Sequence, residues 1–138
     1  MSPKSQIITL DGGGFGHDPD DLSLDHYILD QAAKERPTIC FLATASGDAE
    51  SYRYSYYASF ARLECQPTHL PLFEPPTADL ESFIYDQDII YVGGGNTKSL
   101  LALWREWEMG AAAYELTLRE GIVQETKLEP TIFLGQDD

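Results

Sequence analysis

Short apolar runs alternate with segments of helical periodicity along the first two thirds of the chain. Four of these runs are rich in β-branched and aromatic residues and predict strands: residues 6–10, 38–43, 68–73 and 89–92. Strands that alternate with helices indicate a mainly parallel sheet with right-handed crossovers. We therefore expect an α/β fold, a three-layer sandwich in which the run at 68–73 is a sheet edge, because Pro71 interrupts it.

Apolar stripes at helical spacing predict which faces of two helices are buried. The first stripe consists of Leu24, Tyr27, Ile28, Gln31 and Ala32. The second is rich in tyrosine and consists of Tyr52, Tyr56, Phe60 and Leu63. We interpret the tyrosine stripe as core rather than as an aromatic binding face. Asp48 stands where it can cap this second helix.

The pattern changes in the last part of the chain. Residues 114–118 alternate apolar and polar side chains, a turn follows at Glu120-Gly121, and residues 122–127 return. This predicts an antiparallel β-hairpin rather than a further parallel strand. We expect one domain over residues 1–138, with the C-terminal hairpin region (111–135) packed at one side of the sheet.

Charge and cysteine content narrow the classes of partner. The chain carries 23 acidic and 9 basic residues, a net charge of −14, which argues against nucleic acid and anionic membrane surfaces. Its first residues lack the apolar core of a signal peptide, and no apolar run reaches the length of a membrane span. Cys40 and Cys65 lie in or beside apolar segments and predict buried free thiols. Together these features predict a cytoplasmic protein.

Acidic and histidine side chains are concentrated after the first predicted strand. The cluster consists of His17, Asp18, Asp20, Asp21, Asp25 and His26. A metal site is one interpretation. The other is that Asp20 and Asp21, just before a helix, cap its N–H groups and complement its dipole. We favour the second, because carboxylates alone leave the coordination geometry open, and we predict no metal and no cofactor.

Three glycines, Gly93 to Gly95, directly follow the last buried strand, and Asn96 then begins a helix as a good N-cap. This order places backbone N–H groups around an anionic atom, although a tight turn without a ligand has the same pattern. Thr97 before Lys98 and Ser99 excludes a P-loop, and Lys98 stands where a dinucleotide fingerprint needs its third glycine.

Two other turns fall at the same edge of the predicted sheet, where open α/β proteins bind ligands. The glycine turn at residues 12–16 follows the first strand, and the turn that contains Ser46 follows the second. These positions and the triple-glycine loop supply our candidate ligand-binding residues, which are Gly13, Gly14, Ser46, Gly94, Gly95, Asn96 and Thr97.

The motif IIYVGGGNT (residues 89–97) has three companions in the chain: residues 24–48, residues 57–60 and residues 113–135. Together these stretches resemble the dipeptidase E and cyanophycinase family of serine peptidases, which has a glutamine-amidotransferase-like fold. The resemblance implies hydrolysis of small acidic peptides, such as aspartyl dipeptides, through a Ser-His-Asp/Glu triad. It also implies that Gly93 to Thr97 form the oxyanion loop and that the Gly95 N–H donates to the tetrahedral intermediate.

The sequence departs from this family at the catalytic residues. It contains no G-x-S-x-G nucleophile elbow, and none of His17, His26 and His69 lies in a triad context. The resemblance implies a further segment of roughly 90 residues between Gly110 and the terminal hairpin. Whether that segment is deleted or merely absent from the printed sequence stays open. In either case we expect the 138-residue chain to be inactive alone.

Two functional hypotheses follow. The first is a member or remnant of the serine-peptidase family that acts on a small peptide substrate. The second is a non-catalytic module for small-anion binding or for assembly, which keeps the glycine loops without the chemistry. If a sheet strand is truly missing, Ile89–Val92 becomes an unpaired edge, and a homo-oligomer joined there is expected.

Overall fold

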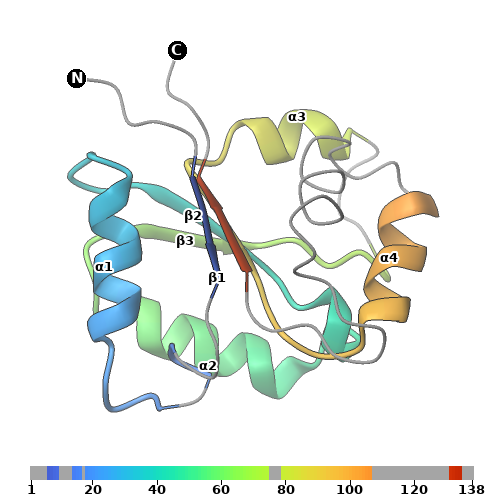
Figure 1. Cartoon of the computed structure of the whole chain (residues 1–138), viewed down its shortest axis with the longest axis horizontal. Coiled ribbons are helices and arrows are strands. Elements are labelled where there is room, and N and C mark those ends of the chain that lie inside the picture. The colour runs from blue at the N-terminus through green and yellow to red at the C-terminus, as the bar shows by residue number, and fades with distance from the viewer. Residues whose placement is uncertain (1–5, 10–13, 17, 75–78, 107–130, 135–138) are drawn as a thin grey trace.

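The computed structural model describes residues 6–9, 14–16, 18–74, 79–106 and 131–134 (Figure 1). Five strands form one sheet in the order β1-β5-β4-β2-β3. Their bounds are β1 Gln6–Thr9, β2 Thr38–Leu42, β3 Gln66–His69, β4 Ile89–Val92 and β5 Thr131–Leu134. β2 is parallel to both β3 and β4, whereas β5 is antiparallel to its neighbours β4 and β1. The predicted mainly parallel sheet is therefore confirmed.

Helices cover both faces of the sheet. Their bounds are α1 Ser23–Gln31, α2 Glu50–Phe60, α3 Leu80–Tyr85 and α4 Thr97–Glu106, and a short 3₁₀ turn, η1, spans Thr44–Ser46. Side chains of β4 alternate between two hydrophobic clusters, since Ile89 and Tyr91 pack with α1 and α2, and Ile90 and Val92 with α3 and α4. This arrangement confirms the three-layer α/β sandwich.

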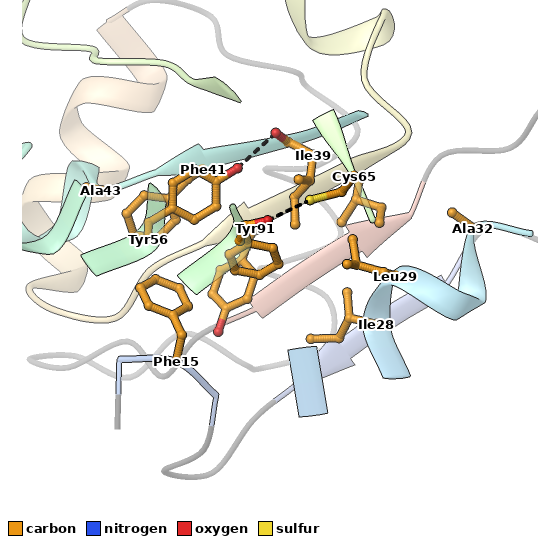
Figure 2. Close-up of a cluster of buried hydrophobic side chains, with 12 residues drawn as sticks. Phe15, Ile28, Leu29, Ala32, Ile39, Phe41, Ala43, Tyr56, Cys65 and Tyr91 are labelled. Atoms are coloured by element: carbon orange, nitrogen blue, oxygen red, sulfur yellow. Dashed lines mark hydrogen bonds between the residues drawn. The ribbon is translucent and has the colours of Figure 1, made fainter. Parts of the chain in front are cut away.

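The cluster under α1 and α2 is dominated by aromatic rings (Figure 2). Phe41 stacks on Tyr56 with ring centroids 4.7 Å apart, and the Tyr56 hydroxyl donates to the backbone oxygen of Ile39 at 3.0 Å. Tyr56 and Phe60 are fully buried, and Tyr52 and Leu63 are partly buried against them. The interpretation of the tyrosine stripe as core is thus confirmed, because each fully buried ring has close apolar neighbours.

The buried face of α1 agrees with the predicted one at Ile28 and Ala32 but differs from it elsewhere. Leu24 and Tyr27 are 45% and 54% exposed, whereas Asp25, Ile28 and Leu29 are buried. The helix is rotated relative to the expected stripe, so that Leu29 rather than Tyr27 lies against the sheet. This rotation places a carboxyl group, Asp25, in the interior.

The edge position of β3 is confirmed, but the strand begins and ends earlier than expected, with Pro71 beyond it. Leu70 and Leu72 leave the strand and join the cluster under α3 and α4. Asp48 does not cap α2, whose N-cap Ala49 makes no side-chain hydrogen bond. Its carboxylate instead accepts from the N–H groups of Leu72, at 2.9 Å, and Phe73, at 3.0 Å.

The expectation that Ile89–Val92 is an unpaired edge is wrong. β4 pairs with β2 on one side and with β5 on the other, where Val92 faces Thr131 and Ile89 faces Leu134. β5 thus lies inside the sheet, next to β1 (Figure 1). The hairpin predicted for residues 114–127 lies outside the described residues. The argument from a strand edge to a homo-oligomer therefore loses its basis.

Asp88 fastens the start of β4 to the start of β2. Its carboxylate accepts from the N–H of Thr38 at 2.9 Å and forms an ion pair with Lys34 at 2.6 Å. Partial burial favours the protonated acid, but the hydrogen bonds from Lys34 and Thr38 outweigh it and lower the pKa of Asp88. The relative register of the two strands that lead to the candidate site is held in this way.

Cys40 and Cys65 are buried free thiols, as predicted. Burial raises the pKa of Cys40 to about 12, so its thiol stays protonated and unreactive at neutral pH. Among the helices that the structure describes, none is both long enough and apolar enough to cross a membrane.

Candidate functional site

The loop from Gly93 to Asn96 is held against the η1 turn at the carboxyl ends of β4 and β2. The N–H of Gly93 donates to the backbone oxygen of Leu42 at 2.9 Å, and the N–H of Asn96 donates to the backbone oxygen of Ala45 at 2.7 Å. Gly95 has φ +146°, and a Cβ there would lie 2.4 Å from the Ala45 oxygen. Only glycine allows the two backbones to approach so closely. The path of the loop is therefore fixed by backbone contacts.

Asn96 is the N-cap of α4, as predicted. Its Oδ1 accepts from the N–H of Ser99 at 3.0 Å, and its backbone oxygen accepts from Leu100 at 3.2 Å. Thr97 is the first residue of α4, and its side chain lies outside the described part. The strand, glycine turn and helix N-terminus therefore occur in the expected order. This arrangement aims a partial positive charge at the edge of the sheet where the loop lies.

Tyr52 brings the two glycine turns together. A Cβ at Gly16 would lie 3.1 Å from Cε1 of Tyr52, and a Cβ at Gly93 would lie 2.8 Å from Cε2 of the same ring. The ring thus fits between the turns because both positions lack a side chain. Gly14, with φ +84°, is buried, and its oxygen accepts from Asp18 at 3.1 Å. Gly13 lies outside the described residues.

The expected convergence of turns at one edge is thus seen for the turn at Gly14–Gly16, η1 and the Gly93–Asn96 loop. Ser46 lies behind Gly95, but its hydroxyl donates to the backbone oxygen of Ala43 at 2.9 Å. We assign it a supporting position in η1. Sequence reasoning missed Tyr52 as a residue of this site and assigned it to the core stripe alone. The available signal was the glycine at both positions that face the ring.

Asp25, which sequence reasoning named only as one member of the acidic cluster, is a second residue of interest. It is fully buried, and neither carboxylate oxygen has a hydrogen-bond partner within normal distance among the described residues. Burial raises its pKa from the ordinary 3.8 to about 6; the N–H groups of Phe15 and Asp25 itself oppose this rise, and the charge of Asp21 adds to it. An uncompensated buried acid is costly, and such groups are concentrated at functional sites.

The other members of the acidic cluster do not surround Asp25. Asp18, Asp20 and Asp21 are exposed, and the residues that the structure describes contain no group of three or more potential metal ligands. Asp21 accepts from the N–H of Ser23, the first residue of α1, at 3.1 Å, in agreement with the capping interpretation. His17 lies outside the described residues.

Replacing Asp25 by Asn is expected to stabilise the protein at neutral and alkaline pH. The folded state holds the Asp25 proton up to about pH 6, whereas the unfolded chain loses it near pH 3.8. Stability should therefore fall as the pH rises between these values and remain lower above them. This rise in pKa corresponds to about 3 kcal/mol. Asp25→Asn should therefore raise the free energy of unfolding by up to about that amount at pH 8 and by little at pH 4.

Urea unfolding at the two pH values measures this difference, with Asp20→Asn as an exposed control that should change little at either pH. A loss of stability for Asp25→Asn at pH 8 would show instead that the ionised carboxylate makes favourable contacts in the folded state.

His69 at the end of β3 is held in a separate polar group. Its Nε2 lies 3.1 Å from Nη1 of Arg53 and its Nδ1 2.5 Å from the Tyr57 hydroxyl. A guanidinium can only donate, so Nε2 accepts and the neutral ring carries its proton on Nδ1. Burial and the charge of Arg53 lower the pKa of His69, while Asp48 opposes them. His69 therefore lies at the edge of the sheet, and both nitrogens of its ring are occupied by structural contacts.

Comparison with known proteins gives a consistent result. The family description "Peptidase family S51" matches residues 7–123. The "uncharacterized peptidase YgaJ" of Bacillus subtilis (strain 168) is 58% identical over 102 residues, which are 74% of this chain and 44% of that relative. The matched part thus spans less than half the length of this relative. No solved structure matches the chain.

The family match covers most of the chain and includes both Tyr52 and the Gly93–Asn96 loop. The geometry of this loop agrees with the motif that carries the resemblance. The chain therefore belongs to peptidase family S51.

Proposed function

We propose that the chain is a serine-peptidase relative of the dipeptidase E and cyanophycinase type, whose Gly93–Asn96 loop binds an oxygen of small acidic peptides such as aspartyl dipeptides. The observation that carries this proposal is the geometry of the loop. Gly95 is locked against Ala45, Asn96 caps α4, and the helix N-terminus stands behind them. Fixed donors and dipoles of this kind stabilise a developing oxyanion.

Acyl transfer also needs a nucleophile activated by a base. The serine would attack the scissile carbonyl and pass its proton to a histidine, which would give that proton to the departing amine as the C–N bond breaks and the acyl-enzyme forms; water would then hydrolyse the acyl-enzyme. The resemblance places both residues in a segment that the 138 residues do not include, and the chain has no G-x-S-x-G. We therefore propose that the 138-residue chain binds acidic peptides but does not hydrolyse them alone.

Purified protein should release no product from the dipeptide Asp-Leu above the rate of a protein-free control. A fluorophosphonate, which reacts with activated serines, should leave no adduct in the intact mass spectrum, and the same spectrum establishes the length of the chain. Asp-Leu should still shift the amide resonances of the Gly93–Asn96 loop, and more strongly than Asn-Leu, whose side chain is uncharged.

Inhibitor-sensitive hydrolysis by the 138-residue protein would contradict the proposed inactivity. Failure of Asp-Leu to shift the loop resonances would contradict the proposed binding role.

A non-catalytic small-anion module is the second candidate, and one observation favours it. The loop keeps its full backbone geometry in a chain without a nucleophile elbow. The two candidates differ in what they bind: a peptidase relative should prefer acidic dipeptides, whereas an anion module should bind simple carboxylates or phosphate equally well. With a net charge of −14, affinities for any anion should be weak.

We also propose a cytoplasmic location. The buried free thiols of Cys40 and Cys65 support it, because a reducing compartment keeps such groups unpaired.

A further inference from the structure

Tyr52 occupies a position that its role in the core does not explain. It lies in the first turn of α2 and is only partly buried, whereas Tyr56 and Phe60 on the same stripe are fully buried. Its ring packs on Phe41, with centroids 4.9 Å apart, and reaches the space between the glycine turns. The hydroxyl end of the side chain thus lies at the edge of the sheet where the glycine turns converge.

The hydroxyl of Tyr52 lies beside both turns. A Cβ at Gly16 would be 3.3 Å from the hydroxyl oxygen. Burial raises the pKa of Tyr52, the N–H of Gly94 beside the phenol oxygen lowers it, and the charge of Asp25 raises it again. The net effect is a raised pKa, so the phenol keeps its proton at neutral pH.

The direction of that proton follows from the neighbouring groups. A backbone N–H can only donate, so in the contact between Gly94 and Tyr52 the phenol oxygen is the acceptor and keeps its own proton for another partner. Neither oxygen of Asp25 has a hydrogen-bond partner among the described residues, so Tyr52 does not donate to Asp25. Among the described residues, no hydrogen bond donated by the Tyr52 hydroxyl is seen, so its proton can be donated to a ligand, and a bond from the Gly94 N–H to the phenol oxygen polarises it further.

We propose that the Tyr52 hydroxyl donates a hydrogen bond to the anionic oxygen of a small carboxylate bound beside the Gly14–Gly16 turn and the Gly93–Asn96 loop. The inference rests on the proposed function, in which this loop binds an oxygen. It adds a side-chain donor to the backbone N–H groups. In a chain without the nucleophile segment, Tyr52 supplies the second donor that an oxyanion requires.

The test uses the full chain and succinate as the probe. Succinate should shift the amide resonances of Gly94 and Gly95 and the Cζ resonance of Tyr52 in a saturable manner. Tyr52→Phe removes the hydroxyl and keeps the ring, so it should fold normally and bind succinate about five- to tenfold more weakly. Tyr54→Phe on the same helix, where the side chain is 76% exposed, is the matched control and should bind as the wild type does.

The possible results separate the two proposals. Equal succinate affinity of Tyr52→Phe and wild type would overturn the role of Tyr52 and leave the loop as the binding site. No saturable shift in the wild type would overturn the carboxylate contact proposed for Tyr52, whereas the binding role of the loop is decided separately by the Asp-Leu titration. If Tyr52→Phe were unfolded, the wild-type Cζ resonance would decide: a succinate-dependent shift supports the contact, and an unchanged resonance refutes it.

Discussion

Gly95→Ala is expected to lower the free energy of unfolding by about 3 kcal/mol or more. The added methyl group would lie 2.4 Å from the Ala45 oxygen and 2.6 Å from its carbonyl carbon. Both atoms belong to the backbone of η1 and cannot rotate away. The φ of +146° at Gly95 adds a conformational cost, because residues with a Cβ rarely adopt it. Urea unfolding followed by circular dichroism measures the effect.

Gly47→Ala is the matched control, since it places the same methyl group at the end of the same turn. Gly47 has φ +70°, but a Cβ there would meet no atom within 4 Å. Only the left-handed backbone then opposes the substitution, at a cost of about 1 to 2 kcal/mol. Equal losses for the two variants would show that contact with Ala45 does not hold the loop.

Phe41→Ala is expected to cost about 3 to 5 kcal/mol. Phe41 is fully buried, and its ring contacts four others: Phe15, Tyr52, Tyr56 and Tyr91, with centroids between 4.7 and 5.8 Å away. Truncation would leave a cavity at the centre of this cluster. Thermal or urea unfolding measures the loss, and Tyr54→Ala, on an exposed face of α2, should stay within about 0.5 kcal/mol of the wild type.

Phe41→Ala should also disturb the packing of the candidate site. A Cβ at Gly93 would lie 3.0 Å from Cε1 of Phe41, so this ring supports both Tyr52 and the start of the glycine loop. Phe41→Leu, which keeps more of the side-chain volume, should lose less stability than Phe41→Ala. A loss below about 1 kcal/mol for Phe41→Ala would contradict the packing described for the cluster.

Local patterns predicted the elements whose causes are local. β4, the glycine turn and the Asn96 cap follow one another in the sequence, and each depends on residues a few positions away. The tyrosine stripe of α2 was recognised for the same reason. The three-layer sandwich followed from the alternation of such elements, because few topologies bury their apolar faces.

Features that depend on distant segments were not predicted. Asp25 is buried by the rotation of α1 against the sheet, and a carboxylate near a helix start has a simpler reading as a dipole partner. Asp48 accepts hydrogen bonds from the N–H groups of Leu72 and Phe73, which are far along the chain, instead of capping the helix that follows it. Tyr52 lies between two turns that neither spacing nor composition connects.

β5 is the clearest case, because its four residues resemble the other strands in composition but nothing local shows that their partners lie near residue 6 and near residue 90. This pairing has a consequence for biosynthesis. In the described sheet, β1 is an edge strand whose neighbour is β5, so residues 6–9 leave the ribosome early and have no strand to pair with until residues 131–134 have been made. The β3-β2-β4 unit can assemble during translation, while completion of the sheet waits for the closure of a very long loop.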